Sequence, residues 1–223
     1  MNIYILDDLM IYSFLKKYEG LSVNKKLNKA CIQGHRELAE RMIKKGASNL
    51  NSGLHGACQG GNRKVVEWMM EEGADDWNWG LYGACLGGHR ELGEWMIKKG
   101  VYRWNWGLCG ACRGGHRDLA EWMIRKGANN WDEGLREACE GGHRELVKLM
   151  IEKGADNWNK GLYGACLGGH RELGEMMIKK GANHWDGGMG EACYSGHREL
   201  VELMIEKGGD SRNCPNKNHC HRV

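Results

Sequence analysis

Hydrophobic and small residues recur along this chain with a period of 27 residues. One complete unit reads GLYGACLGGHRELGEWMIKKGVYRWNW, from Gly80 to Trp106. A fixed period of this order predicts a repeat protein, in which one short structural unit is stacked several times. The copies, numbered here from position 1 to position 27, begin at Lys26, Gly53, Gly80, Gly107, Gly134, Gly161 and Gly188.

The first third of each copy predicts a short helix. Positions 2, 5, 6 and 9, mostly Leu, Ala, Cys and Gly, share one side of a helical wheel, and positions 3, 4, 7 and 8 share the other. Gly at position 9 should end this helix in the left-handed conformation. Position 10 is His in six copies and Asn62 in the other, and it opens a second helix. Since both side chains can accept a hydrogen bond and Asn is a good N-cap, we expect a structural hydrogen bond there.

The second helix is amphipathic. Positions 13, 14, 16, 17 and 18 are mostly apolar, whereas positions 11, 12, 15 and 19 are mostly charged. Gly at position 21 ends the helix in every copy. Isolated helices this short are marginal in water, so stability must come from stacking copy on copy. The pattern predicts an all-α solenoid of helix-turn-helix units.

The repeated text also resembles a known family. Ala-Cys, Gly-His, Glu-Leu and a terminal Lys-Gly-Ala, seven times in register over residues 26–213, are similar to the ankyrin repeat. The nearest likeness is to the short-repeat ankyrin-like arrays of large DNA viruses of amoebae. An ankyrin unit has about 33 residues and opens with a β-turn finger, and about six residues fewer are present here. The resemblance therefore implies a protein-binding solenoid whose hairpin fingers are reduced or absent, so that only contacts of the inner-helix face carry over.

The two ends of the chain fall outside the repeat. Residues 1–25 do not fit the frame, but apolar residues at helical spacing between Tyr4 and Tyr18 predict an N-terminal capping helix. A truncated F-box is the alternative, because LDDLMIYSFL resembles the opening of that domain. We thus expect a cap over 1–25, an array over 26–213 and a polar tail over 214–223.

Composition excludes several classes of function. The net charge is +3, from 32 basic and 29 acidic residues, so no global field marks nucleic acid or a membrane as the partner. No secretory leader or long apolar run is present, which predicts an intracellular, cytoplasmic protein, in the host cytoplasm if it is viral. No phosphate loop, catalytic triad or paired acid/base motif appears. We expect a monomer that binds no cofactor and is not an enzyme.

Cysteine and histidine form columns that could suggest metal or redox chemistry. Equivalent positions of stacked helices lie about 8 to 10 Å apart, too far for a disulfide or a shared zinc ion. The column cysteines should therefore stay reduced, and Cys109 with Cys112, a C-x-x-C, should have no redox role. The tail offers a further set of possible metal ligands, whose spacing fits no zinc motif. The column comprises Cys31, Cys58, Cys85, Cys112, Cys139, Cys166 and Cys193, and the tail set comprises Cys214, His219, Cys220 and His221.

Two further columns are interpreted as structural. Position 11 is Arg in all seven copies, which could bind phosphates, but six of these arginines have Glu four residues later and should be neutralised by it. Position 25 is Trp in five copies, from Trp77 to Trp185, and should pack at the joint between repeats. The nucleic-acid-binding alternative would depend on the arginine column together with exposed aromatic residues.

Differences between copies predict the binding site. Positions 3, 4 and 7 should face away from the buried side of the first helix, and position 27 should lie in the turn before it. In copies two to four these positions carry residue types that dominate protein interfaces. Drift among redundant copies is the competing interpretation. The predicted partner-binding residues are His55, Gln59, Trp79, Tyr82, Leu86, Trp106, Cys109 and Arg113.

Overall fold

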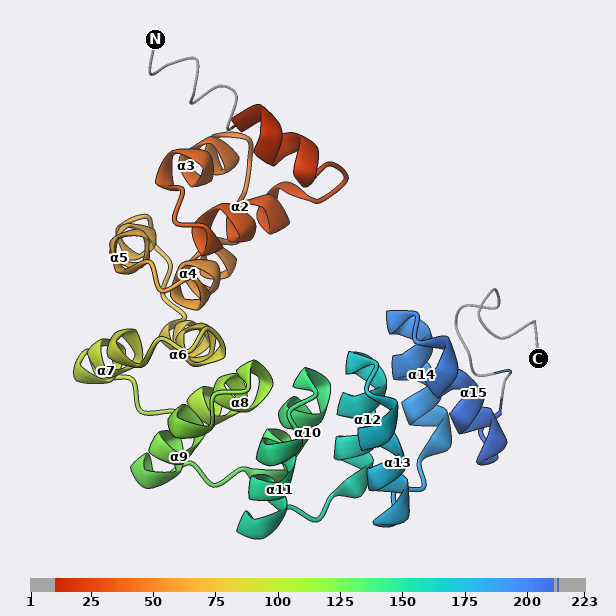
Figure 1. The fold of residues 1–223 in the computed structure, drawn as a ribbon. Helices are drawn as coiled ribbons and strands as arrows, with labels where there is room; N and C mark the ends of the chain where they lie inside the picture. The colour runs from red at the N-terminus through yellow and green to blue at the C-terminus, as the bar shows by residue number, and fades with distance from the viewer. Residues whose placement is uncertain (1–10, 211, 213–223) are drawn as a thin grey trace. The chain divides into compact units, whose positions relative to one another are not determined.

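The computed structural model describes residues 11–210 and 212. Over these residues the regular structure is helical throughout and contains no strand, as the repeat pattern predicts. The chain forms two compact units, one ending at Val101 and the other beginning at Tyr102. We describe each by itself (Figure 1).

The first unit contains a helix over residues 11–17, followed by three helix pairs. In each pair a first helix is joined by a Gly-containing turn to a second helix. The first helices α2, α4 and α6 contact one another in succession. The pairs are α2 (Val23–Ile32) with α3 (Arg36–Lys44), α4 (Leu50–Gln59) with α5 (Arg63–Glu71), and α6 (Trp77–Leu86) with α7 (Arg90–Lys98).

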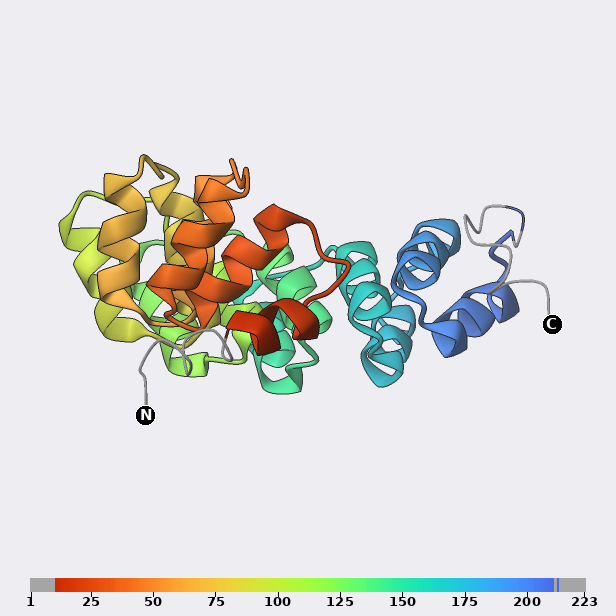
Figure 2. The ribbon, with the colours of Figure 1, turned by 90° about the horizontal axis from the view of Figure 1, so that it is seen from above.

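The second unit contains four pairs built in the same way. Figure 2, turned by 90° from the view of Figure 1, shows the last two pairs in cyan and blue. The first helices α8, α10, α12 and α14 again contact one another in succession. The pairs are α8 (Trp104–Gly114) with α9 (Arg117–Lys126), α10 (Trp131–Gly141) with α11 (Arg144–Lys153), α12 (Trp158–Gly168) with α13 (Arg171–Lys179), and α14 (Trp185–Ser195) with α15 (Arg198–Glu206).

The core follows the predicted hydrophobic positions. In α6, Leu81, Ala84 and Cys85 at positions 2, 5 and 6 are fully buried, and Met96 of α7 packs at position 17. Glycines at positions 9 and 21 end the helices with positive φ, as Gly88 (+81°) and Gly100 (+101°) do. The predicted buried face of the first helix and both glycine stops are confirmed.

The first helix begins earlier than the sequence pattern suggests. It starts at position 25, because the residue at position 24 acts as its N-cap. Asp76, for example, accepts a hydrogen bond from the backbone N–H of Trp79 at 3.0 Å. Position 27 was predicted to lie in the turn, and this is wrong: Trp79 and Trp106 lie in the first turns of α6 and α8.

Position 4 also lies elsewhere than predicted. It was expected on the exposed side of the first helix, but Gly56 and Gly83 are buried. A Cβ added at Gly83 would lie 2.6 Å from the carbonyl oxygen of His55 in the preceding repeat. Position 4 therefore belongs to the contact between successive first helices, and glycine permits their close approach.

The side chain at position 10 makes the predicted structural hydrogen bond, but to a different partner. His89 begins α7 without capping it. Its Nε2 lies 3.0 Å from the carbonyl oxygen of Gln59, at position 7 of the preceding repeat, and His143 contacts the carbonyl oxygen of Arg113 in the same way. Asn62 donates from Nδ2 to the carbonyl oxygen of Ile32 at 3.0 Å. His and Asn are thus equivalent as donors to the repeat before them, not as acceptors in their own.

A second link between repeats was not predicted. The side chain at position 26 accepts hydrogen bonds from the backbone N–H groups at positions 23 and 24 of the next repeat. Oδ1 of Asn159 accepts from the backbone N–H groups of Asn183 (2.9 Å) and His184 (3.0 Å). Oδ1 of Asp132 accepts from those of Asp156 and Asn157 in the same way. This link fixes the short joint between repeats.

Tryptophan at position 25 packs at the joint between repeats, as predicted. A Cβ added at Gly127 would lie 3.7 Å from Cδ1 of Trp104, in the repeat before it, and Trp158 lies equally close to Gly181. The indole covers the glycine that ends the next second helix.

The residues before the first repeat bury apolar side chains. In the helix over 11–17, Ile11 and Phe14 are buried, and the Phe14 ring packs edge-on against Tyr18 at 4.8 Å. Gln33, after α2, donates from Nε2 to the Tyr18 hydroxyl at 3.1 Å. The segment thus contacts the first repeat. The part of the predicted helix before residue 11, and the tail from residue 213, lie outside the described residues.

Candidate protein-binding surface

The predicted partner-binding residues divide between the two units. His55 and Gln59 lie on α4, and Trp79, Tyr82 and Leu86 lie on α6, all in the first unit. Trp106, Cys109 and Arg113 lie on α8 in the second unit. We call the outward positions 3, 7 and 27 of successive first helices the first-helix face.

In the first unit the structure brings three of these residues together. The imidazole of His55 stacks on the indole of Trp79, with ring centroids 4.8 Å apart and an interplanar angle of 27°. The same imidazole lies 5.8 Å from the ring of Tyr82, also at 27°. We call His55, Trp79 and Tyr82 the aromatic stack. All three are half-buried, so each ring rests on a neighbour while part of it remains open to a partner.

In the second unit three of these residues follow one line along α8. Trp106, Cys109 and Arg113 are spaced three and four residues apart, which places them on one side of the helix. The Trp106 side chain is 44% exposed. Arg113 forms ion pairs with Glu137 and Glu140 of α10, and thus starts a group of charges that extends along the unit.

Sequence reasoning missed the other members of that group. Arg136 of α10 contacts three carboxylates: Glu133 at 3.0 Å, Glu140 at 3.3 Å and Glu137. Lys160 of α12 lies 2.7 Å from Glu133. The signal is present in the sequence, because copy five carries charged residues at positions 3, 4, 7 and 27, outside the copies that the predicted site covers. We call Arg113, Glu133, Arg136, Glu137, Glu140 and Lys160 the charged cluster.

The pKa values of the cluster reflect mutual neutralisation. Burial raises the pKa of the Glu133 carboxyl, but hydrogen bonds from Lys160 and Arg136 outweigh burial and leave the pKa below its ordinary value. Burial lowers the pKa of the Arg136 guanidinium, while Glu137, Glu133 and Glu140 together raise it above its ordinary value. Both groups stay charged at neutral pH.

The arginine column is engaged as predicted. In the six copies with Glu at position 15, the Arg Nε lies 2.7 to 3.0 Å from the carboxylate. Arg36 and Arg63 also lie over the indole rings of Trp68 and Trp95 in the next repeat, at 5.1 and 4.9 Å. These six arginines therefore form ion pairs within the protein, and the column is no bare basic stripe.

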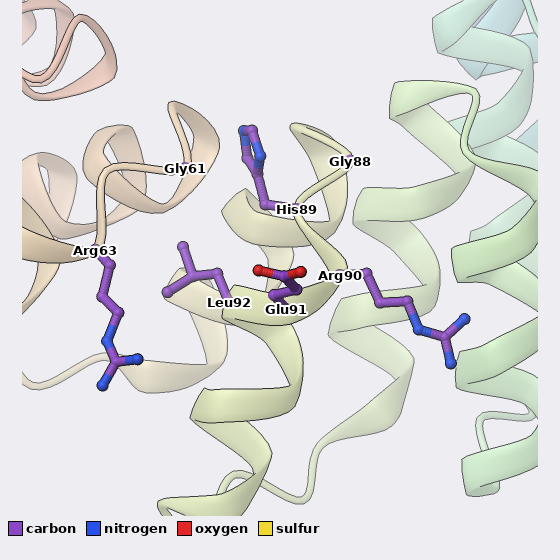
Figure 3. A pocket seen from close by; sticks show the side chains of 7 residues that line it. All are labelled: Gly61, Arg63, Gly88, His89, Arg90, Glu91 and Leu92. Atoms are coloured by element: carbon purple, nitrogen blue, oxygen red, sulfur yellow. The ribbon is translucent and has the colours of Figure 1, made fainter.

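A hollow of about 420 Å³ opens between the second helices of the first unit, lined by Gly61, Arg63, Gly88, His89, Arg90, Glu91 and Leu92. Figure 3 shows the guanidinium ends of Arg63 and Arg90 pointing away on opposite sides, with Glu91 between them. A hollow of about 270 Å³ in the second unit, around Arg171 and Arg198, is lined by the same seven positions. This cavity is a product of the repeat, and no residue distinguishes one copy of it.

Most cysteines in the described part of the chain are free thiols. Cys109 and Cys112 are free thiols, and burial raises the pKa of Cys109 to about 12 and that of Cys112 well above its ordinary value. No three His, Cys, Asp or Glu side chains in this part of the chain could together hold a metal ion. Six column cysteines are free, but the prediction is wrong for Cys193, which is disulfide-bonded. Repeat spacing excludes only pairs within the column, and Cys193 does not pair within it.

Among the described residues, no helix is both long enough and apolar enough to cross a membrane.

Comparisons with known proteins add little to this description. No family model matches the chain, and none of the curated proteins matches it. Among solved structures, the crystal structure of the human ASB11 ankyrin repeat domain is similar to this chain, with 22% sequence identity and a TM-score of 0.42. The match covers 82% of this chain and 98% of that one. A likeness of this strength assigns neither family nor partner, so the description of the fold rests on the helix pairs themselves.

Proposed function

We propose that this chain is a non-enzymatic scaffold that binds another protein through the first-helix face of its repeats. This proposal is supported by the difference between positions that build the fold and positions that vary on its surface. Positions 2, 5, 6, 9 and 21 hardly vary and build the core and turns, whereas positions 3, 7 and 27 differ from copy to copy on the same regular frame. The aromatic stack occupies these variable positions.

The residue types at these positions support a protein partner. Trp, Tyr and Arg carry most of the binding energy of protein interfaces, and they occur here as Trp79, Tyr82, Trp106 and Arg113. Stacking on His55 restricts the Trp79 side chain, so less conformational entropy is lost when a partner covers it. The ankyrin resemblance of the sequence agrees with this role. On the same resemblance, we propose further that the chain is a monomeric, intracellular viral protein that binds a host protein.

The nucleic-acid-binding alternative is less favoured. Its basic stripe would be the arginine column, and six of those arginines are paired with glutamate. Binding of single-stranded RNA or duplex DNA that weakens steeply with salt, and that fails on replacement of Arg63 and Arg90 but survives Trp79→Ala, would favour this alternative over a protein partner.

The test of the proposal is capture of a partner from the native cell, followed by mass spectrometry. The combined variant Trp79→Ala, Tyr82→Ala and Trp106→Ala should lose the partner that the unaltered chain captures. Because Trp79 stacks on His55, the variant should lose about 0.5 to 1.5 kcal/mol of stability, and capture is measured well below its melting temperature. Tyr194→Ala is the matched control, since Tyr194 is an aromatic residue at position 7 that is 84% exposed. Capture that persists in the triple variant contradicts the proposal.

A further inference from the structure

In the charged cluster, acidic and basic side chains differ in how far they are exposed to solvent. Two of its three acidic side chains are buried: those of Glu137 and Glu140 are only 5% exposed, whereas that of Glu133 is 30% exposed. Its basic side chains lie above them, and the side chains of Arg113, Arg136 and Lys160 are 41%, 29% and 38% exposed. A partner approaching this surface meets mainly cations, although the six formal charges cancel.

The buried carboxylates hold the guanidinium groups in place. Arg136 donates from Nε to Glu133, from one terminal nitrogen to Glu140 and from the other to Glu137. A guanidinium has five N–H donors, so three of them are used in these bonds and two are left over. Since its orientation is already fixed by three partners, a further hydrogen bond from Arg136 costs little additional side-chain entropy.

On α8, the neighbours of the cluster are not acidic. Trp106 precedes Glu133 by one repeat at position 27, and Cys109 precedes Arg136 by one repeat at position 3. Trp106 is 44% exposed and Cys109 is half-buried. The cations of α10 and α12 are therefore bordered, on α8, by an apolar strip.

We propose that the charged cluster binds the carboxylate of an Asp or Glu side chain in a peptide segment of the protein partner, with an apolar side chain of that segment against Trp106. This proposal rests on the proposed function, because it specifies the chemistry of the partner. Arg136 and Lys160 bind the carboxylate, and Glu137 and Glu140 position the guanidinium groups beneath it.

The charge balance favours a carboxylate over a phosphate. Three cations over three carboxylates present a shallow positive surface, which suits a single negative charge better than a phosphate with nearly two. Nucleic acid needs cations that follow a backbone over many phosphates, and the arginines of the second helices are mostly paired with glutamate. A localised acidic side chain of a protein fits the observations.

The experiment selects random 12-residue peptides by phage display on the full-length chain. Enriched peptides are then synthesised and their dissociation constants measured by fluorescence anisotropy. We expect enriched peptides to share an Asp or Glu beside an apolar residue. Its replacement by Asn or Gln should raise the dissociation constant about tenfold or more, the range for a charge-assisted hydrogen bond.

Variants of the chain assign that effect to the cluster. Lys160→Met should weaken the acidic peptide several-fold and leave its Asn or Gln form unchanged. This substitution leaves no buried carboxylate behind, because Glu133 is 30% exposed and keeps Arg136. Arg136→Gln combined with Glu137→Gln and Glu140→Gln removes the central charges together, and circular dichroism reports whether it folds. The matched control is Lys179→Met on α13, an exposed lysine off the first-helix face, which changes the net charge equally and should leave affinity unchanged.

Several outcomes would overturn the inference. Equal loss of affinity in Lys160→Met and Lys179→Met would show a general charge effect. A peptide whose Asp is replaced by phosphoserine and then binds more than tenfold tighter would identify a phosphate site. Enriched peptides that lack carboxylates but depend on Trp79 and Tyr82 would overturn this inference and leave the proposed function standing, whereas no enrichment at all would contradict both.

Discussion

The imidazole of His89 reaches back across the joint between two repeats, where its Nε2 lies 3.0 Å from the backbone carbonyl oxygen of Gln59. A carbonyl oxygen can only accept, so this contact requires the proton on Nε2. The ring fills the space beside Gly61 and Gly87, where an added Cβ would lie 2.6 and 2.7 Å from ring atoms. One side chain thus both bonds and packs against the preceding repeat.

His89→Ala should therefore destabilise the chain by about 1 to 3 kcal/mol, because it leaves a partly buried carbonyl unpaired. His89→Asn should cost less than half as much, since Asn62 makes the equivalent bond in the copy before. Urea denaturation followed by circular dichroism measures both. Equal loss in the two variants would show that ring packing, and not the hydrogen bond, matters at position 10.

Gly87→Ala should be among the most damaging single-methyl additions in the chain. The new Cβ would lie 2.1 Å from the carbonyl oxygen of Gln59, a backbone atom that cannot rotate away, and 2.7 Å from the His89 ring. We expect a loss of about 3 kcal/mol, the upper end for overpacking. Gly190→Ala is the matched control: it lies within α14 and its Cβ meets nothing within 4 Å, so it should gain about 0.5 to 1 kcal/mol. Similar melting temperatures for the two would refute the close approach.

Asn159→Ala should loosen the next turn locally. It removes the acceptor of two backbone N–H groups, those of Asn183 and His184, and should cost about 1 to 2 kcal/mol. Amide hydrogen exchange at Asn183 and His184 should accelerate. Asn159→Asp should retain slow exchange, because Asp132 holds its own following turn in the same way. Fast exchange in the Asp variant would mean that more than the acceptor is needed.

The buried thiols should make the chain sensitive to alkali. Burial raises the pKa of Cys31, Cys85, Cys139 and Cys166 from 9.0 to about 12. Above pH 9 the unfolded chain releases thiol protons that the folded chain retains, so stability falls with rising pH until pH 12. Each such thiol contributes roughly 1.4 kcal/mol per pH unit. Denaturation between pH 7 and pH 11 measures this slope.

Two further measurements accompany the alkaline titration. Cys85→Ala should reduce the pH dependence of the unfolding free energy by roughly 1.4 kcal/mol per pH unit, the contribution of one thiol, whatever its effect on stability at pH 7. Iodoacetamide at pH 8 should leave these four cysteines unmodified in the folded chain and modify them in guanidinium, as peptide mass spectrometry can show. An unchanged slope in Cys85→Ala would assign the alkaline loss to other groups.

Features that depend on a single residue type within one copy could be predicted from the sequence. Glycine at positions 9 and 21 predicted both helix ends, because only glycine takes positive φ readily. The start of the first helix was not predictable in the same way. Its cap at position 24 varies, from Asp76 to Arg103 to His184, and the tryptophan after it is no strong helix signal.

Contacts that depend on how successive repeats are stacked could not be predicted from the sequence. The acceptor of His89 lies 30 residues earlier in the chain, and it is a backbone atom that no side-chain pattern reveals. The charged cluster combines residues from three first helices, α8, α10 and α12. The burial of Glu137 follows from the burial of position 4, which was predicted to be exposed. The partner-binding residues themselves remain a prediction.

Two recurrent bonds between one repeat and the next end on backbone atoms: position 10 donates to a carbonyl, and position 26 accepts from two N–H groups. Neither of these two bonds therefore depends on which side chains occupy positions 3, 7 and 27 of the neighbouring repeat. A copy could be removed, duplicated or exchanged as a block of 27 residues, and both new joints would still form these two bonds. The lineage of such a chain can change its length and its binding residues independently, by recombination between copies as readily as by substitution.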